Sequence, residues 1–115
     1  MLIIFLFIIS VLSNELNATN CFELKDDNKT IIIKTNDCCN QILNYKEIVE
    51  TIEFDDSVTS IGNQCFMNFE KLTTINFNTG ITEIGKYAFY NTKIKQITIL
   101  ESVELIEEFA FAENK

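Results

Sequence analysis

One short motif occurs three times in this chain and limits its possible folds more than any other feature. In each copy an Ile is followed five residues later by a Phe, and the copies occupy residues 60–66, 83–89 and 105–111. The flanking sequence keeps the same spacing, because Ile52, Ile75 and Ile97 are 23 and 22 residues apart. Self-similarity at a fixed period of about 20 to 50 residues indicates a repeat architecture.

The period divides the second half of the chain into three units, at residues 49–71, 72–93 and 94–115. Each unit begins with alternating apolar residues, which predicts a short strand with one buried face. A polar loop, a second extended piece and a helical turn follow, and we expect the helical turns at residues 64–66, 87–89 and 109–111. We expect Phe66, Phe89 and Phe111 to stack in one internal ladder, and Gly62 and Gly85 to relax the backbone where it turns. The sequence therefore predicts an α/β solenoid of about three units.

The repeated pattern resembles the BspA-type leucine-rich repeat. The resemblance covers residues 49–115 and is most direct where Leu72, Ile75 and Phe77 are followed by Ile84-Gly85 and Ala88-Phe89. It implies a right-handed stack and a secreted or cell-surface protein of bacteria or parasitic protists that acts in adhesion and host contact. The chain departs from the family pattern by having Cys65 in place of Ala, Glu107 in place of Gly, and no Pro after the first strand of any unit.

The N-terminus predicts secretion. Residues 1–11 form an almost unbroken apolar run, which is shorter than the roughly 20 residues that span a bilayer. We interpret residues 1–13 as a signal peptide that is removed after Ser13. A buried N-terminal element and an uncleaved membrane anchor are the alternatives. In a secreted protein, the sequons at Asn17 and Asn28 are expected glycosylation sites.

Residues 14–48 lack the repeat pattern, and we expect them to form an N-terminal cap, since a repeat stack needs atypical ends. Residues 22–24 and 31–33 flank a polar turn around Asn28, and we expect these two segments to be the strands of a hairpin. Four cysteines allow three pairings, and we expect Cys21 to pair with Cys38 or Cys39. Cys65 occupies the position of Ala in the other copies, which favours a buried free thiol.

Composition argues against several classes of function. The formal net charge of −8 would repel nucleic acid. The chain has no His, so it lacks the usual general base and the commonest metal ligand. Its carboxylate pairs, such as Glu107 with Glu108, are expected to be solvated on the outside of the stack. We therefore expect no enzyme activity, no cofactor and no metal site.

The candidate site is the outward face of the first strands. Parallel strands that stack in a repeat protein form a concave binding surface, and the polar residues between the buried positions would point out from it. These residues are Thr51, Glu53, Asp55, Thr74, Asn76, Asn78, Gln96 and Thr98. We expect them to recognise a protein or a glycan on a cell surface. The alternative is a solvated face without a ligand, in which case the chain is a structural spacer.

The last unit ends without a recognisable cap. We therefore expect the chain either to be a fragment of a longer array or to self-associate through its final repeat, where strand edges and apolar area would stay open. In the spacer alternative, the N-terminal helix remains uncleaved and anchors the chain. All these expectations place the protein outside the cell or on its surface.

Overall fold

The computed structural model describes residues 21–114. The expected signal peptide and the sequon at Asn17 lie outside this range. The elements are β1 (Phe22–Lys25), β2 (Thr30–Ile33), the 3-10 helices η1 (Cys39–Gln41) and η2 (Leu43–Tyr45), β3 (Thr51–Phe54), β4 (Ser60–Ile61), β5 (Thr74–Asn76), β6 (Glu83–Ile84) and β7 (Leu105–Ile106). No α-helix occurs within residues 21–114.

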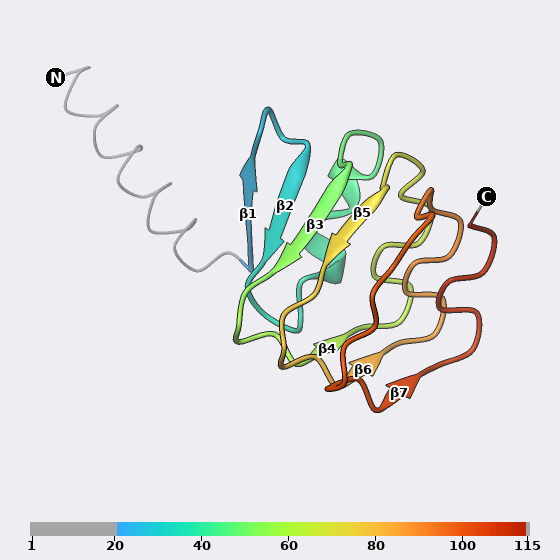
Figure 1. Ribbon diagram of the computed structural model, residues 1–115. Coiled ribbons are helices and arrows are strands. Elements are labelled where there is room, and N and C mark those ends of the chain that lie inside the picture. Colours follow the sequence, from blue (N-terminus) through green and yellow to red (C-terminus); the bar gives the residue numbers. More distant parts are fainter. Residues whose placement is uncertain (1–20, 115) are drawn as a thin grey trace, which may run out of the picture.

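The first sheet has the strand order β1-β2-β3-β5, and Figure 1 shows these strands side by side. The β1–β2 pair is antiparallel, which confirms the expected hairpin. From β2 onward the pairing is parallel, and Ile31, Ile52 and Ile75 lie opposite one another in successive strands. The hairpin therefore does more than cover the stack, because its second strand begins the parallel ladder.

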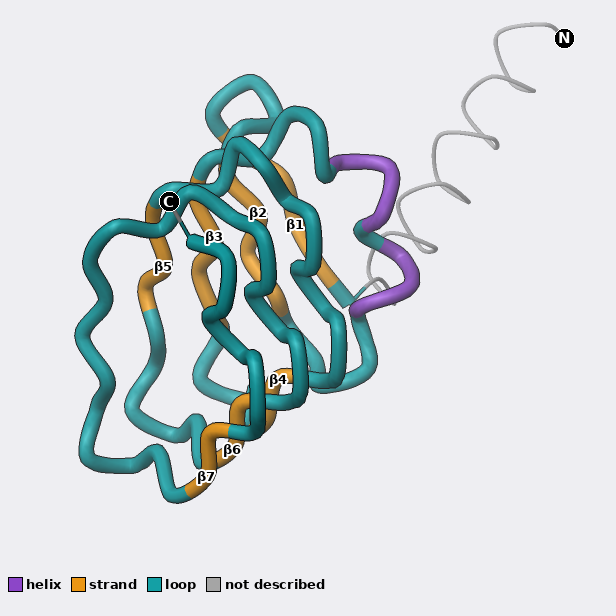
Figure 2. Tube along the Cα trace, turned by 90° about the vertical axis from the view of Figure 1, so that its right-hand side faces the viewer, coloured by secondary structure: helices purple, strands orange, loops and turns teal. Residues whose placement is uncertain are grey.

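The second sheet confirms the predicted second extended piece of each repeat. It is parallel, has the order β4-β6-β7, and aligns Ile61, Ile84 and Ile106. The chain passes from the first sheet to the second and returns through a layer of turns, and Figure 2 shows these coils stacked on one another. The result is a repeat fold in which each coil depends on its neighbours for hydrogen bonds.

The helical turns that were expected to close each unit are absent, and successive β-turns take their place. Every second backbone N–H reaches the next coil: Gln64 N donates to Lys86 O over 2.9 Å, and Phe66 N donates to Ala88 O over 2.7 Å. A helical turn would use these groups within its own coil. The turns need left-handed residues, and φ is near +60° at Gln64, Asn68, Tyr87, Asn91, Phe109 and Glu113.

The predicted Phe ladder is confirmed. The Phe66 and Phe89 rings stack with centroids 5.2 Å apart, and Phe89 stacks on Phe111 at the same separation. Phe66 and Phe89 are fully buried. Burying one such side chain contributes about 1.5–3 kcal/mol, so the ladder is a main source of stability between coils.

The glycines of the motif serve close packing, not the backbone freedom that the sequence suggested, because none has a positive φ. A Cβ on Gly85 would lie 2.6 Å from Asn63 Oδ1 and 2.8 Å from Asn63 N, which is too close for any other residue. In the last copy Glu107 replaces the glycine. Its Oε2 accepts a hydrogen bond from Lys86 N over 3.0 Å.

The cysteines form two disulfides. Cys21 is bonded to Cys38, one of the two expected pairings. The expected free thiol at Cys65 is wrong, because Cys65 is bonded to Cys39. The 3-10 segment packs against the first copy of the motif and places the Cα atoms of Cys39 and Cys65 4.7 Å apart. Among the described residues no cysteine is free.

Candidate binding face

The outward face of β3 and β5 carries two rows of polar side chains. The sheet register places Thr51 opposite Thr74 and Glu53 opposite Asn76. These side chains alternate with the buried Ile52 and the half-buried Ile75, as the period of two requires. Thr74 and Asn76 are exposed, while Thr51 and Glu53 are half-buried. The structure therefore brings four of the eight predicted site residues together.

The N-terminal hairpin extends this face, which sequence reasoning missed. Ile32 of β2 lies opposite Glu53, and Lys25 Nζ of β1 lies 3.1 Å from Glu53 Oε1. Glu23 lies on β1, the outer strand, and its Oε2 is 2.8 Å from Nζ of Lys34, the residue that follows β2. The hydrogen bond from Lys34 lowers the pKa of the Glu23 carboxyl. The three consecutive Ile residues of β2 show no alternation of apolar and polar residues, so no periodic signal in the sequence indicated this role.

Asp55 is exposed but lies beyond the residues that the paired strands align. It follows β3, and its Oδ1 accepts hydrogen bonds from Ser57 N and Ser57 Oγ, each over 3.0 Å. The backbone N–H of Ser57 is the main cause that lowers the pKa of Asp55, followed by the Ser57 hydroxyl. The carboxylate therefore stabilises the turn that leaves the strand.

Asn78 was predicted to point outward from the binding face, and this prediction is wrong. Its side chain points inward and is only 8% exposed. Its Nδ2 donates to Asp55 O over 2.5 Å and to Val58 O over 2.9 Å. Its Oδ1 accepts from Gly80 N over 2.6 Å. A buried side chain with every polar atom bonded to the backbone of two coils fastens the turns and cannot meet a partner.

Gln96 and Thr98 are exposed but do not join the rows. The expected third strand is absent, since residues 93–100 contain no strand. Lys93 N donates to Leu72 O over 2.8 Å, and the next backbone bond between these coils is Glu104 N to Thr82 O. Between these two bonds the segment stands away from β5.

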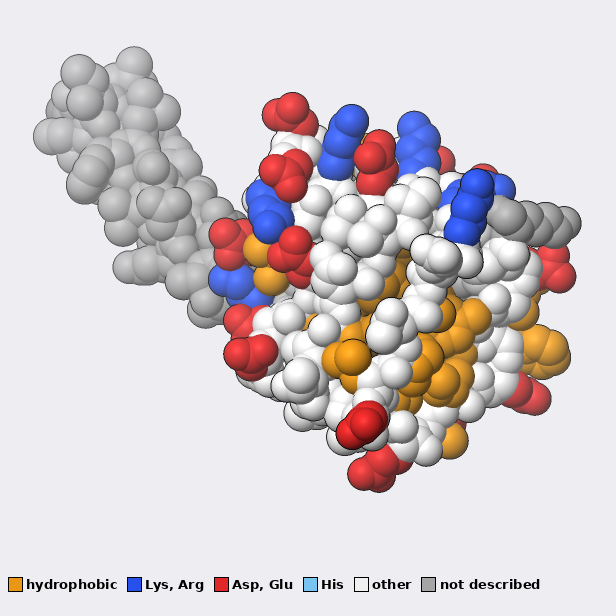
Figure 3. Space-filling view, viewed as in Figure 1, with side chains coloured by type: hydrophobic (Ala, Val, Ile, Leu, Met, Phe, Trp, Pro, Cys, Tyr) orange, Lys and Arg blue, Asp and Glu red, His pale blue; other side chains and the backbone are white. Residues whose placement is uncertain are grey.

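An open groove separates β5 from this segment. Its lining comprises Thr73, Thr74, Ile75, Asn76, Phe77, Lys93, Lys95, Gln96, Ile97, Thr98 and Leu100. Figure 3, in the orientation of Figure 1, shows hydrophobic side chains exposed here with polar groups around them. The volume of about 1330 Å³ exceeds the roughly 300–1,000 Å³ of small-molecule pockets. Its size and openness suit an extended chain more than a small molecule.

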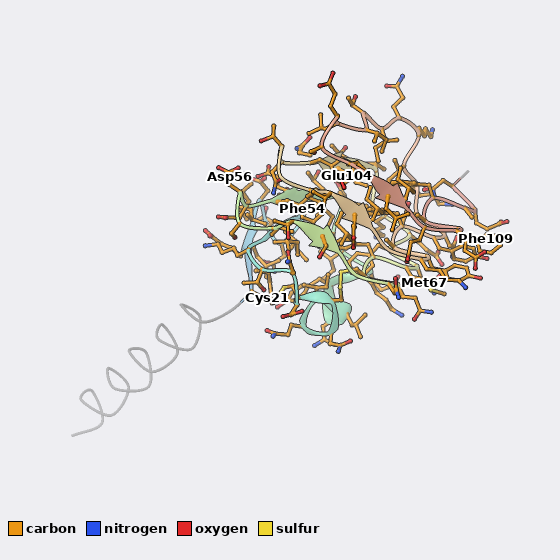
Figure 4. The ribbon with its side chains drawn as sticks, turned by 90° about the horizontal axis from the view of Figure 1, so that it is seen from below. Cys21, Phe54, Asp56, Met67, Glu104 and Phe109 are labelled. Carbon is orange, nitrogen blue, oxygen red and sulfur yellow. A yellow bond between two sulfur atoms is a disulfide. The ribbon has the colours of Figure 1, made fainter. Side chains whose placement is uncertain are left out.

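The end of the stack is partly closed by Asn114, which sequence reasoning also missed. Its Nδ2 donates to Phe89 O and Phe111 O, and its Oδ1 accepts from Ile94 N and from the buried Thr92 hydroxyl. Large apolar side chains nevertheless remain exposed at this end. They are Ile99, Leu105, Ile106 and Phe109, at 40–51%, and Figure 4 places Phe109 at the opposite end of the molecule from Cys21.

Within residues 21–114, no three of the side chains that bind metals gather into a cluster. The same part of the chain has no helix with the length and apolar character to cross a membrane.

Parallel ladders that recur every 22 or 23 residues, with an outward polar face, define a leucine-rich-repeat protein. The chain belongs to the BspA-type leucine-rich repeat family, because the family model described as "BspA type Leucine rich repeat region (6 copies)" matches residues 36–115. The match begins before residue 49, where the resemblance in the sequence was placed.

A solved structure of a leucine-rich repeat protein from Eubacterium ventriosum is similar in fold, with a TM-score of 0.59 and 24% sequence identity. The similarity covers 74% of this chain but 25% of that one, so the chain spans about a quarter of the solved protein. The comparison with curated proteins gave no match.

Proposed function

We propose that this chain is an extracellular protein-binding module that receives its partner on the outward face of β2, β3 and β5. The observation that carries the proposal is the pair of polar rows in register, Thr51 with Thr74 and Glu53 with Asn76. A parallel ladder holds these side chains rigidly, so a partner would not have to order them, which lowers the entropic cost of binding.

Three observations support the extracellular location. The four cysteines are paired, which is typical of oxidising compartments. Asn28 is exposed at the tip of the hairpin turn, where a glycan would disturb no packing. The apolar run at residues 1–11 has the length of a signal-peptide core. In this proposal residues 1–13 are removed, residues 14–48 form the cap, and residues 49–115 form the repeats.

The experiment uses fluorescently labelled mature chain on cultured epithelial cells and on deposited extracellular matrix. Saturable binding is expected, and the variant Thr51→Arg/Asn76→Arg should lose at least tenfold in affinity because two long side chains would cover the polar rows. The control Gln41→Arg/Asn44→Arg makes the same charge change on the 3-10 segment and should bind normally. Treating the surfaces with protease or with glycosidase separates a protein partner from a glycan.

No saturable binding to any surface would favour the structural-spacer alternative. Loss of binding in the Gln41→Arg/Asn44→Arg control, with the face variant unaffected, would move the site away from the sheet. Edman sequencing of secreted protein tests the location: a first residue of Asn14 is expected, and cytosolic protein that begins at Met1 would contradict it.

A second candidate is self-association through the last coil, favoured by the exposed apolar residues Leu105, Ile106 and Phe109. A second copy that packs on this end would bury them. Sedimentation velocity should then show dimers that Leu105→Glu/Phe109→Glu converts to monomers. A wild-type monomer at high concentration would exclude this candidate.

A further inference from the structure

The groove beside β5 differs from the rest of the face because it is bordered by an open strand edge. β5 is the last strand of its sheet. Thr74 N donates to Glu50 O on the β3 side, and successive residues of a strand direct their N–H and C=O groups to opposite edges. The N–H and C=O of Ile75 and of Phe77 therefore point into the groove, where no strand pairs with them.

The charge of the groove is unlike that of the whole chain. The chain has a formal net charge of −8, yet the groove lining contains Lys93 and Lys95 and no Asp or Glu. No ion pair among the described residues engages either lysine. The unneutralised positive charge next to the strand edge selects for an acidic occupant.

The floor of the groove is apolar. Ile75, Phe77, Ile97 and Leu100 line it, and Figure 3 shows hydrophobic side chains reaching the surface at this place. An added strand directs alternate side chains to opposite faces. A peptide that alternates apolar and acidic residues would thus place its apolar residues on this floor and its acidic residues toward the lysines.

We propose that the groove binds an extended acidic peptide of a partner protein, which pairs with the free edge of β5 as an added strand. The peptide occupies the place that the third strand of the ladder would hold if the 93–100 segment lay against β5. Main-chain hydrogen bonds from Ile75 and Phe77 supply affinity, and the floor and the lysines supply specificity, as in other cases of strand addition. This inference rests on the proposed protein-binding function and names the class of partner.

The test uses a fluorescein-labelled, acetylated and amidated peptide of the sequence Thr-Val-Glu-Val-Asp-Val-Thr, measured by fluorescence anisotropy. Two control peptides carry N-methyl groups at alternate residues, one set for each edge of the peptide. At least one of them should bind tenfold or more weakly, because it cannot pair with β5. If both methylated forms bind within twofold of the unmethylated peptide, no strand forms, and the proposal is overturned.

Two charge variants locate the peptide. Lys93→Glu/Lys95→Glu should weaken binding at least tenfold, whereas Lys29→Glu/Lys46→Glu changes the net charge equally, lies outside the groove, and should leave binding within twofold. In amide NMR spectra, Ile75 and Phe77 should shift and exchange more slowly with the peptide bound. Shifts in β1 instead, the other open edge of the same sheet, would overturn the assignment. So would slow exchange of Ile97 before the peptide is added, because the segment would then close the groove itself.

Failure of this proposal is separable from failure of the proposed function, because Thr51 lies on the face but outside the groove lining. Consider a partner whose capture is lost with Thr51→Arg but is unchanged with Lys93→Glu/Lys95→Glu. This result would support the binding face as the site of the partner and would overturn the proposal that a peptide strand binds in the groove.

Discussion

Replacing Asn78 by Ala should destabilise the fold strongly without touching the binding face. The side chain is buried and makes three hydrogen bonds to backbone groups, at Asp55 O, Val58 O and Gly80 N. Each bond contributes about 0.5–1.5 kcal/mol, and its loss leaves a backbone group without its partner. We expect the free energy of unfolding to fall by roughly 2–4 kcal/mol, which is a large part of the 5–15 kcal/mol typical of a domain.

Urea denaturation followed by circular dichroism measures this effect. With an m-value of about 2 kcal/mol/M, in the middle of the usual range, the midpoint should fall by about 1–2 M. The matched control is Asn76→Ala, two residues earlier, where the side chain is exposed and the change should stay within about 0.5 kcal/mol. Equal midpoints for Asn78→Ala and Asn76→Ala would refute the structural role of Asn78 and would return it to the candidate site.

Three further changes test other parts of the fold. Phe89→Ala, in the middle of the ring ladder, should cost about 3–5 kcal/mol, while Phe109→Ala at the half-exposed end should cost at most about 1 kcal/mol; equal losses in thermal unfolding would contradict the ladder. Cys39→Ala/Cys65→Ala opens a loop with a sequence separation of 26 and should cost about 3 kcal/mol, and unchanged urea unfolding would argue against this disulfide. Asp55 has a lowered pKa in the folded state, so its contribution is complete above about pH 4 and is lost as the pH falls through the folded value. Asp55→Asn cannot titrate, so the difference in free energy of unfolding between wild type and variant should narrow below pH 4. A difference that stays constant with pH would exclude this contribution of the Asp55 carboxylate.

The features that sequence reasoning predicted are those set by the period. The spacing of Ile52 and Ile75 aligned the first parallel ladder, and the spacing of Phe66, Phe89 and Phe111 aligned the rings. The hairpin was predictable because its polar turn and the two segments that flank it are close together in the sequence. These features depend on which residues are apolar and how far apart they are.

The features that sequence reasoning missed depend on partners in other coils. Gln64 lies in a β-turn and not in a helical turn, because the N–H groups of this segment bond to the next coil. Cys65 pairs with Cys39 only because the 3-10 segment folds back onto the first copy of the motif. Asn78 appeared to continue the outward row of β5, but the chain turns after Phe77 and the amide points inward.

The candidate site was predictable only where its residues lie in paired strands. Thr51 and Thr74 lie within paired strands, where the period of two fixes the outward direction. Gln96 and Thr98 have the same pattern in sequence, but the 93–100 segment does not pair with β5, so the pattern alone could not place them. The groove and its two lysines exist because of this separation.

The central claim is that a partner protein binds the face of the first sheet and not the layer of turns. Hydrogen–deuterium exchange with a captured partner tests it most directly, because one measurement reports on both faces of the molecule. We predict slower exchange on binding at residues 50–54 and 73–77, with residues 64–69 and 87–91 unchanged. Protection confined to residues 64–69 and 87–91 would contradict the claim.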